Sequence, residues 1–492
     1  MKIILLLILF ALVTFLAAKQ KKWYICLLAA FAELIPEQFA FELHDKLPLI
    51  SGIRVLVLVV LAFWLYDKWK TKKFSLPKSI LIYIGVNLLI SLVNLRWGGG
   101  EIKRIFLFIF ERGLLVIALA DMIKTREEFE STIDFMLLGS VILALIAMAQ
   151  TVFKYDILSV LHVTDRFSVQ LTDRMGLIRA FGATNAIAYG CYCAFISLLA
   201  VYKLRTSGKQ YYGIALALNF VAMLCTMSRS AWLCFAFISF CILVFQGKYL
   251  FKKLLPSFGI AVSFILVLCL CQPILGRALT ETAKSTANTV LSAVLPEGTF
   301  RFEESSESLF PPEEDENAPD IGFDISDEFG LNKTGASYSR LVEWTSVSYM
   351  LEEGEGIFGY GYNAFLRGKL HYFYKQFGFW TVAKTLDVGL LNVATESGIL
   401  GLCTFLAFLG YLFYRAFQGR GKQETFNFLN IVLYMIPLYL LINFMAAYLY
   451  ATTVWLFIGL FYAYRKLDTH KLLSDAPAVT APAPTQSADT DC

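Results

Sequence analysis

The sequence predicts an all-α membrane protein that crosses the bilayer many times, from its composition, the length of its apolar runs and the spacing of its basic residues. Of its 492 residues, 57% are hydrophobic and 15% are aromatic, and the mean hydropathy is +0.61. Such values are typical of membrane proteins and not of soluble domains. The formal net charge of +4 is small for this length, so it gives no indication of a nucleic-acid partner.

Apolar runs long enough for membrane-spanning helices recur along the chain. The hydrocarbon core of a bilayer requires about 20 apolar residues in a helix, with a range of roughly 17 to 25. Thirteen runs are candidates, which gives about twelve spans by this rule, and the first two are the weakest. The runs are residues 3–18, 23–34, 52–66, 79–95, 104–121, 131–153, 183–202, 211–226, 230–246, 253–274, 388–414, 428–446 and 449–464.

The N-terminal run, MKIILLLILFALVTFLAA, has the apolar character of a secretory signal peptide. A cluster of Lys19, Lys21 and Lys22 follows it directly, and this flank is more typical of a retained anchor than of a cleaved signal. The sequence therefore predicts retention.

The ten cysteines lie inside apolar runs, except for Cys492 at the C-terminus. None of them has the spacing of a metal site or of a disulfide framework. They are interpreted as small core residues, and neither a metal nor a cofactor is expected.

Basic connectors predict one orientation in the membrane, because short loops rich in Lys and Arg stay in the cytoplasm. Connectors of this kind fall on alternate turns, at residues 67–78, 124–127, 203–210, 246–253, 415–422 and 464–471. The opposite, outer face then carries residues 35–51, 96–103, 154–182, the short joint at Arg229, residues 275–386 and residues 447–448.

The same reasoning divides the chain into four parts. Residues 1–274 are N-terminal transmembrane helices, residues 275–386 are a large outer loop with short helices, and residues 387–466 are C-terminal transmembrane helices. The loop contains an acidic stretch, EESSESLFPPEEDENAPDIGFDISDE, of low hydrophobicity. Residues 467–492 are rich in Pro, Ala and Thr and are expected to form a disordered cytoplasmic tail.

Four ionisable residues from distant segments meet on the predicted outer face: Arg179, Arg229, Arg340 and Asp387. Each alone has an ordinary explanation, as an interfacial arginine, a solvated residue on a helix or a helix N-cap. Together they indicate a site, because ionisable groups at membrane depth are rare and usually line a cavity or pair with one another.

A helix through SRLVEWTSVSYMLEE would place Leu341, Trp344, Val347 and Leu351 on one apolar stripe, with Arg340 at its edge and able to pair with Glu343. The glycines of the following GEGIFGYGYNAF allow close backbone approach, but this stretch lacks the context of a nucleotide-binding loop.

Asp387 and Glu396 lie nine positions apart in DVGLLNVATESGILG. On one helix they would face opposite ways, so a paired-carboxylate mechanism is disfavoured and Glu396 is assigned to helix packing.

The order of these motifs resembles the O-antigen ligase and O-antigen polymerase superfamily of bacterial membrane glycosyltransferases. The motifs are RAFGATN, TMSRSAW, SRLVEW, GIFGYGYNAF and LDVGLLNVATESGILG, and they cover roughly residues 175–405. The resemblance implies an undecaprenyl-pyrophosphate-linked glycan as donor, a second glycan or lipid-linked glycan as acceptor, and no metal. It also implies a multi-pass protein of the bacterial inner membrane, active on the outer face, with a chain-length regulator and a flippase as partners.

By this resemblance Arg179, Arg229 and Arg340 bind the pyrophosphate, while Asp387 and Arg340 are catalytic and Asn185, Ser228 and Glu343 support the site. Guanidinium groups suit this role because they present fork-shaped donors to phosphate and keep their charge. Many ligases of the family have a histidine at the position of Asp387. This difference favours a polymerase of O-antigen, capsule or exopolysaccharide over a ligase that joins the finished glycan to lipid A core or to protein.

A protein of another class, a transporter or flippase of lipid-linked glycans, is the remaining alternative. The large outer loop, the one-sided charges and the lack of an internal sequence repeat argue against it. The sugar, the linkage and the oligomeric state do not follow from the sequence.

Overall fold

The computed structural model of this chain describes most of the helical regions. The described residues are 21–36, 38–41, 49–71, 77–97, 100–161, 173–174, 177–294, 356–362, 388–421, 426–446 and 451–474, with residues 8, 11, 15, 343, 344, 347, 348, 351 and 448. Arg340 and Asp387 lie outside this part of the chain, as do most of the acidic loop and the C-terminal tail.

Helices dominate the described residues, which confirms an all-α membrane protein. The first half contains α2 (Lys21–Phe31), α3 (Gly52–Thr71), α4 (Lys78–Asn94), the short η1 (Leu95–Trp97), α5 (Gly100–Phe106), the π-helix η2 (Leu107–Leu114), α6 (Leu115–Met122), α7 (Arg126–Phe153) and the short η3 (Ile157–Leu161). The second half contains α8 (Ala186–Ser207), α9 (Tyr211–Cys225), α10 (Arg229–Cys271), α11 (Pro273–Val294), α15 (Gly389–Gly419), α16 (Phe428–Met445) and α17 (Thr452–Ser474).

Two very short antiparallel strand pairs accompany the helices. β1 (Ala40–Phe41) pairs with β2 (Ile50–Ser51), and β3 (Asp173–Arg174) pairs with β4 (Leu177–Ile178). Both belong to connectors predicted to lie on the outer side.

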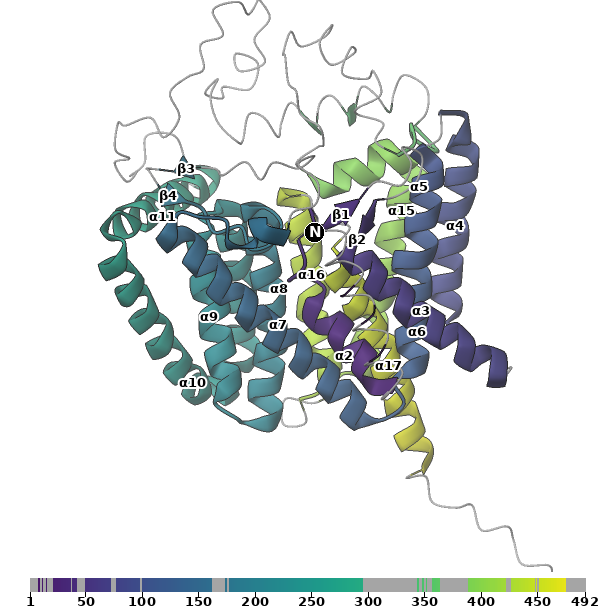
Figure 1. The fold of residues 1–492 in the computed structure, drawn as a ribbon, viewed down its shortest axis with the longest axis horizontal. Coiled ribbons are helices and arrows are strands. Elements are labelled where there is room, and N and C mark those ends of the chain that lie inside the picture. The colour runs from purple at the N-terminus through teal and green to yellow at the C-terminus, as the bar shows by residue number, and fades with distance from the viewer. Residues whose placement is uncertain are drawn as a thin grey trace, which may run out of the picture.

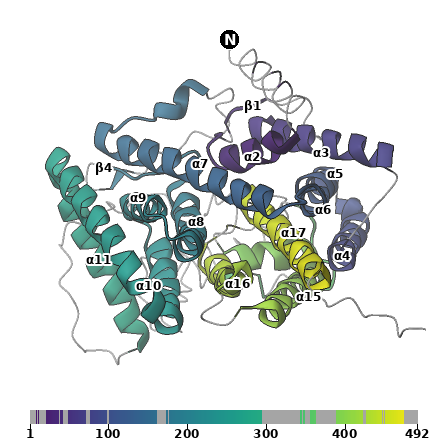
Figure 2. The same cartoon turned by 90° about the horizontal axis from the view of Figure 1, so that it is seen from below.

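The helices form two groups joined by α16 and α17. Figures 1 and 2 show α8 to α11 on one side of the bundle and α3 to α6 on the other, with α16 and α17 between them. Aromatic rings fill the junction: Phe195 of α8 lies 5.4 Å from Phe457 of α17, and Phe457 lies 5.3 Å from Phe428 of α16, measured between ring centroids. Edge-to-face and tilted pairs of this kind add to the packing of the apolar core.

Seven of the described helical segments are long and apolar enough to span a membrane: Lys78–Trp97, Arg126–Phe153, Ala186–Ser207, Arg229–Gly247, Lys252–Cys271, Gly389–Gly419 and Phe428–Met445. Each overlaps a run predicted from the sequence. The total of about twelve spans and the four-part division of the chain remain predictions.

α10 doubles back on itself, as the predicted basic connector at residues 246–253 requires. A straight helix of its 43 residues would extend about 65 Å, roughly twice the hydrocarbon thickness. Its two halves instead line the same cavity, to which Ile238 and Ala261 both contribute. At its far end, Gln272 donates to the carbonyl of Val152 in α7, at 3.3 Å.

The basic connectors gather at one end of the bundle, the lower end in Figure 1. There Lys203 of α8 pairs with Glu130 at 3.0 Å and with Asp134 at 2.8 Å, both on the first turns of α7. Asp121 likewise pairs with Lys68 and Lys466. The positive-inside rule predicts that this end faces the cytoplasm.

Candidate functional site

The joint between α9 and α10 is a tight turn at Thr226–Ser228. Met227 adopts a left-handed conformation, with φ of 50°, which is uncommon for a residue with a side chain. The Ser228 amide donates to the Thr226 hydroxyl at 3.2 Å, and the Ser228 hydroxyl accepts from the Ala231 amide at 3.5 Å. Ser228 is therefore the N-cap of α10, and the turn is held by its own side chains.

Arg179 and Arg229 both lie at this turn, although they are far apart in the sequence. Nε of Arg179 donates to the Thr226 carbonyl at 2.7 Å, and the neighbouring Ala180 amide donates to the Cys225 carbonyl at 3.0 Å. Arg229 follows the turn directly, and its Nη1 donates to the Ser285 hydroxyl of α11 at 2.9 Å. Both arginines are partly buried, so their charge acts in a partly dry environment.

The segment that carries Arg179 is tied to the helices on both sides. Nε2 of Gln150 in α7 donates to the Gly182 carbonyl at 2.8 Å, and Oε1 of Gln150 accepts from the Gly182 amide at 3.0 Å. The Asn185 side chain accepts from the Ala188 amide at 2.8 Å and is the N-cap of α8. In the described structure Asn185 therefore positions a helix start.

α11 packs along the same end of the bundle, at the top in Figure 1. It buries Leu275, Ala278, Thr282 and Ser285, a helical stripe that faces the bundle, and leaves Arg277 exposed. The buried end of this stripe is where Ser285 meets Arg229. An amphipathic helix thus covers one side of Arg229.

Glu343 lies at the start of α15. Its Oε2 accepts from the Val388 amide at 3.3 Å, and Val347, one turn further on, is buried against α15. The Trp344 ring lies 5.6 Å from that of Phe444 in α16. These contacts agree with the predicted apolar stripe at Trp344 and Val347, and they place Glu343 beside Val388.

α15, which overlaps the predicted span 388–414, is broken at one point. Gly398 has φ of 65° and ψ of −171° inside α15. The backbone groups released by the break are paired with the glycine-rich loop 356–362. The amides of Tyr360 and Gly361 donate to the carbonyls of Thr395 and Glu396, at 2.8 and 3.1 Å, and the amides of Ile399 and Leu400 donate to the carbonyls of Gly356 and Ile357, at 2.8 and 3.1 Å.

Two glycines allow this contact. A Cβ on Gly359 would lie 2.4 Å from the amide nitrogen of Gly398, and a Cβ on Gly398 would lie 2.2 Å from the Ile357 carbonyl oxygen. Because both residues also have positive φ, only glycine fits without strain. The glycines of this motif serve backbone-to-backbone packing.

A buried polar cluster that the sequence reasoning missed lies beneath the break. Arg104 of α5 donates from Nη1 to the Glu396 carbonyl at 3.0 Å, and from Nη2 to the Ser397 hydroxyl. Its partner Glu101 lies 3.8 Å away and accepts from the Tyr362 amide. Arg104 is 4% exposed and Glu101 is fully buried, so the pair fixes the loop and the broken helix together.

The π-helix η2 extends this polar cluster. Glu111 of η2 pairs with Arg54 of α3, and the Arg112 guanidinium lies 4.5 Å from the Phe108 ring and 5.7 Å from that of Trp455. Burial raises the pKa of Tyr362, and the negative charge of Glu396 raises it further. The predicted run 104–121 contains four charged residues, and charges in an apolar run could have indicated a polar cluster here. The π-helical geometry, which is common at functional sites, comes from tertiary packing.

Within the described ranges, no three His, Cys, Asp or Glu side chains lie close enough to hold a metal ion. Arginines lie at the α9–α10 turn and at α5 to η2, and in the second place Glu101 and Glu111 pair with Arg104 and Arg54.

The fold and these buried ionisable groups define a multi-pass membrane protein with a polar site at one end of its helix bundle. Residues 214–406 match a protein family described as O-antigen ligase. This part of the chain therefore belongs to the O-antigen ligase and polymerase superfamily. Membership implies a bacterial membrane glycosyltransferase that acts on lipid-linked glycans in polysaccharide biosynthesis. No curated protein matches the chain.

The matched region includes Arg229, Arg340 and Asp387. It begins after Arg179, which therefore lies outside it. It also includes both partners of the contact between loop 356–362 and α15, whereas Glu101 and Arg104 lie outside it.

Proposed function

We propose that the protein transfers a glycan from undecaprenyl pyrophosphate to a sugar hydroxyl of an acceptor glycan, as a polymerase of surface polysaccharide. The reaction would take place on the outer face of the inner membrane, at the end of the bundle that carries Arg179 and Arg229. The observation that carries the proposal is that two arginines far apart in the sequence lie at one turn: Arg179 donates to the Thr226 carbonyl, and Arg229 is the first residue after the turn.

A pyrophosphate is the ligand that this arrangement suits best. Guanidinium groups bind phosphate oxygens with two parallel donors, and each charge-assisted hydrogen bond contributes about 1.5 to 3 kcal/mol. In the structure, Nε of Arg179 donates to the Thr226 carbonyl and Nη1 of Arg229 donates to the Ser285 hydroxyl. These bonds hold Arg179 against the turn and Arg229 against α11.

The chemistry proposed is a direct displacement. The acceptor hydroxyl oxygen forms a bond to the anomeric carbon of the donor glycan, the bond between that carbon and the diphosphate oxygen breaks, and the hydroxyl proton passes to a base. The diphosphate leaves with increasing negative charge, which the arginines stabilise electrostatically. This role is the one that a divalent cation has in other transferases, so we propose a metal-independent reaction.

Asp387 is the residue that we propose as the base, with Arg340 as the third arginine. A carboxylate can accept the proton if its environment raises its pKa, and otherwise it orients the acceptor. The contact of Glu343 with Val388 supports the proposal, because these residues follow Arg340 and Asp387 closely in the sequence.

Transfer by purified protein in liposomes tests the function. With an undecaprenyl-pyrophosphate-linked repeat unit as the only substrate, the protein should produce polymer without added metal and in the presence of EDTA. Arg229→Ala and Arg179→Ala should each lower kcat/KM about 10- to 100-fold, as expected for one lost charge-assisted bond. Arg277→Ala, an exposed arginine of α11 on the same side, is the matched control and should leave transfer unchanged. Unchanged transfer in the Arg229 variant contradicts the assignment.

A ligase is the close alternative, and the products separate the two. Loss of a polymerase leaves surface lipopolysaccharide capped with a single repeat unit, whereas loss of a ligase leaves the core alone. If the liposomes instead move the lipid-linked glycan across the bilayer and form no glycosidic bond, the protein is a transporter.

A further inference from the structure

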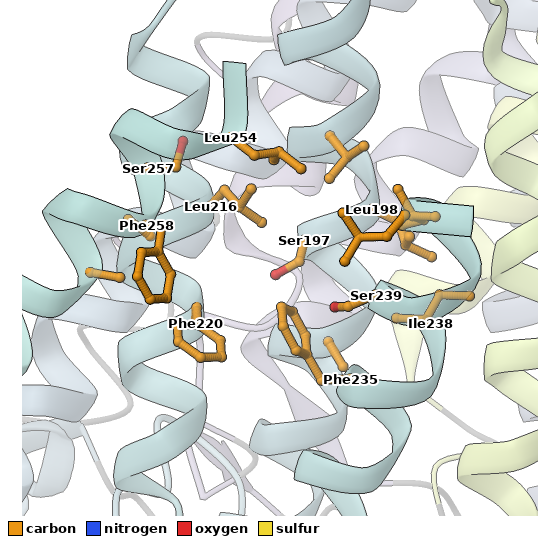
Figure 3. Close-up of a pocket in the computed structure, with 16 residues that line it drawn as sticks. Ser197, Leu198, Leu216, Phe220, Phe235, Ile238, Ser239, Leu254, Ser257 and Phe258 are labelled. Atoms are coloured by element: carbon orange, nitrogen blue, oxygen red, sulfur yellow. The ribbon is translucent and has the colours of Figure 1, made fainter. Parts of the chain in front are cut away.

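An apolar cavity of about 190 Å³ lies between α8, α9 and the two halves of α10 (Figure 3). Ala194 and Leu198 of α8, Leu216 and Phe220 of α9, and Ile238 and Phe258 of α10 are among the residues that line it. Three serines, Ser197, Ser239 and Ser257, are the only polar residues among the sixteen that line it, and the Ser197 hydroxyl donates to the Cys193 carbonyl at 2.7 Å. The lining therefore suits a hydrocarbon ligand.

The cavity opens from the protein core to the side of the bundle. Part of the lining is fully buried, such as Ala194 and Ile238, at 0% and 2% exposure, whereas Phe258 and Leu243 are 64% and 48% exposed. In a membrane these exposed apolar side chains face lipid. A chain can thus enter between the helices from the bilayer.

The depth of the cavity is set by the helices that line it. Phe235 and Ile242 lie on α10 about 9 and 20 Å below Arg229, at 1.5 Å per residue. On the returning half, Ala261 and Leu254 lie about 15 and 26 Å below Cys271. Half of the hydrocarbon core is about 15 Å thick, so the cavity reaches from one leaflet past the midplane into the other.

We propose that this cavity binds the isoprenoid chain of the lipid-linked glycan donor, an inference that rests on the proposed function. A pyrophosphate at Arg179 and Arg229 places the start of its chain at the outer end of α10, directly above the cavity. An acyl chain of an ordinary phospholipid in that leaflet ends near the midplane. A chain that starts at Arg229 and fills the cavity must be longer, as a polyprenyl chain of eleven units is. The cavity would then select long-chain donors.

Filling the cavity tests the proposal. Ala261 is 2% exposed and lines the cavity, whereas the next residue, Val262, is 39% exposed and does not line it. Ala261→Phe should raise KM for the undecaprenyl donor about tenfold, the effect of losing the burial of about two methylene groups. The same variant should change KM for a farnesyl donor with the same glycan less than about twofold, because the shorter chain reaches less of the cavity. Val262→Phe is the matched control and should change neither.

A second variant controls for the possibility that Ala261→Phe misfolds. Ser239→Phe fills the cavity from the other half of α10, and it should show the same difference between the two donors. An equal loss of transfer with both donors, or an unchanged KM for the undecaprenyl donor in both variants, overturns the proposal.

A binding measurement separates this proposal from the proposed function. The probe is undecaprenyl phosphate added to the full-length protein in nanodiscs of phosphatidylethanolamine and phosphatidylglycerol. If the wild-type protein transfers no glycan from any donor, the proposed function fails, yet Ala261→Phe should still weaken binding of the probe about tenfold relative to Val262→Phe. If the two variants bind the probe equally and differ only in co-purified phospholipid, the cavity holds an acyl chain and the proposal is wrong.

Discussion

The Arg104 guanidinium donates to the Glu396 carbonyl at 3.0 Å, and so joins α5 to the point where α15 breaks. A carbonyl released from a helix inside a membrane protein requires a partner, because water is scarce there. The same guanidinium also bonds Ser397 and balances the fully buried Glu101. Arg104 thus provides a hydrogen-bond donor for the broken helix and a positive charge for the buried Glu101 carboxylate.

Arg104→Ala is accordingly expected to destabilise the protein strongly. It leaves the Glu101 carboxylate buried without this cation, a change that costs about 3 to 5 kcal/mol in buried ion pairs. Thermal unfolding in detergent should show a lower Tm. A double variant, Arg104→Met with Glu101→Gln, should recover part of the loss, because it removes both charges. A Tm for Arg104→Ala equal to that of the wild type rules out this role.

Gly398→Ala is expected to disrupt the contact of α15 with loop 356–362. The added Cβ meets the Ile357 carbonyl at 2.2 Å, and φ of 65° is unfavourable for alanine; a strained backbone of this kind costs about 1 to 3 kcal/mol. We expect a lower Tm and, since the loop precedes the segment of Asp387, a lower kcat. Gly410→Ala in the same helix has no atom within 4 Å of the added Cβ and should stabilise slightly. Similar effects of the two substitutions would contradict the explanation.

The span positions could be predicted from the sequence because they depend on local hydropathy. The predicted run 183–202 corresponds to α8, Ala186–Ser207, and the basic connector at 246–253 marks where α10 turns back. Topology also predicts that Arg179 and Arg229 lie on one side of the membrane, and both lie at the turn Thr226–Ser228. What these arginines bind stays a prediction.

The break in α15 and the cluster at Arg104 could not be predicted in the same way. The break depends on hydrogen bonds to a loop about 40 residues earlier, and a glycine in a transmembrane helix more often serves helix packing. Glu101 falls in the predicted outer connector 96–103, and Arg104 is the first residue of the predicted span 104–121, so the sequence pattern singled out neither residue. Only their tertiary partners, Glu396 and Tyr362, show that they are buried.

Asn185 provides a test of whether a residue from a sequence motif binds substrate or caps a helix. Asn185→Ala should reduce stability by about 1 kcal/mol, the usual cost of a lost N-cap. Asn185→Ser keeps a capping oxygen and should restore the Tm. If the side chain only caps α8, Asn185→Ser should also keep transfer at the wild-type rate. Loss of transfer with an unchanged Tm would instead assign Asn185 to the substrate.

Arg179 and Arg229 should behave as one unit if they hold the same pyrophosphate. Residues without a shared partner have additive effects on free energy, whereas residues that share a ligand are coupled by about 0.5 to 3 kcal/mol. Arg179→Ala with Arg229→Ala should therefore lose less transfer activity than the product of the two single losses, because one substitution already misplaces the diphosphate. The measurement is a double-mutant cycle on kcat/KM, with Arg277→Ala combined with Arg229→Ala as the control, which should be additive. Additivity of the Arg179 and Arg229 losses would mean that the two guanidinium groups act on different ligands.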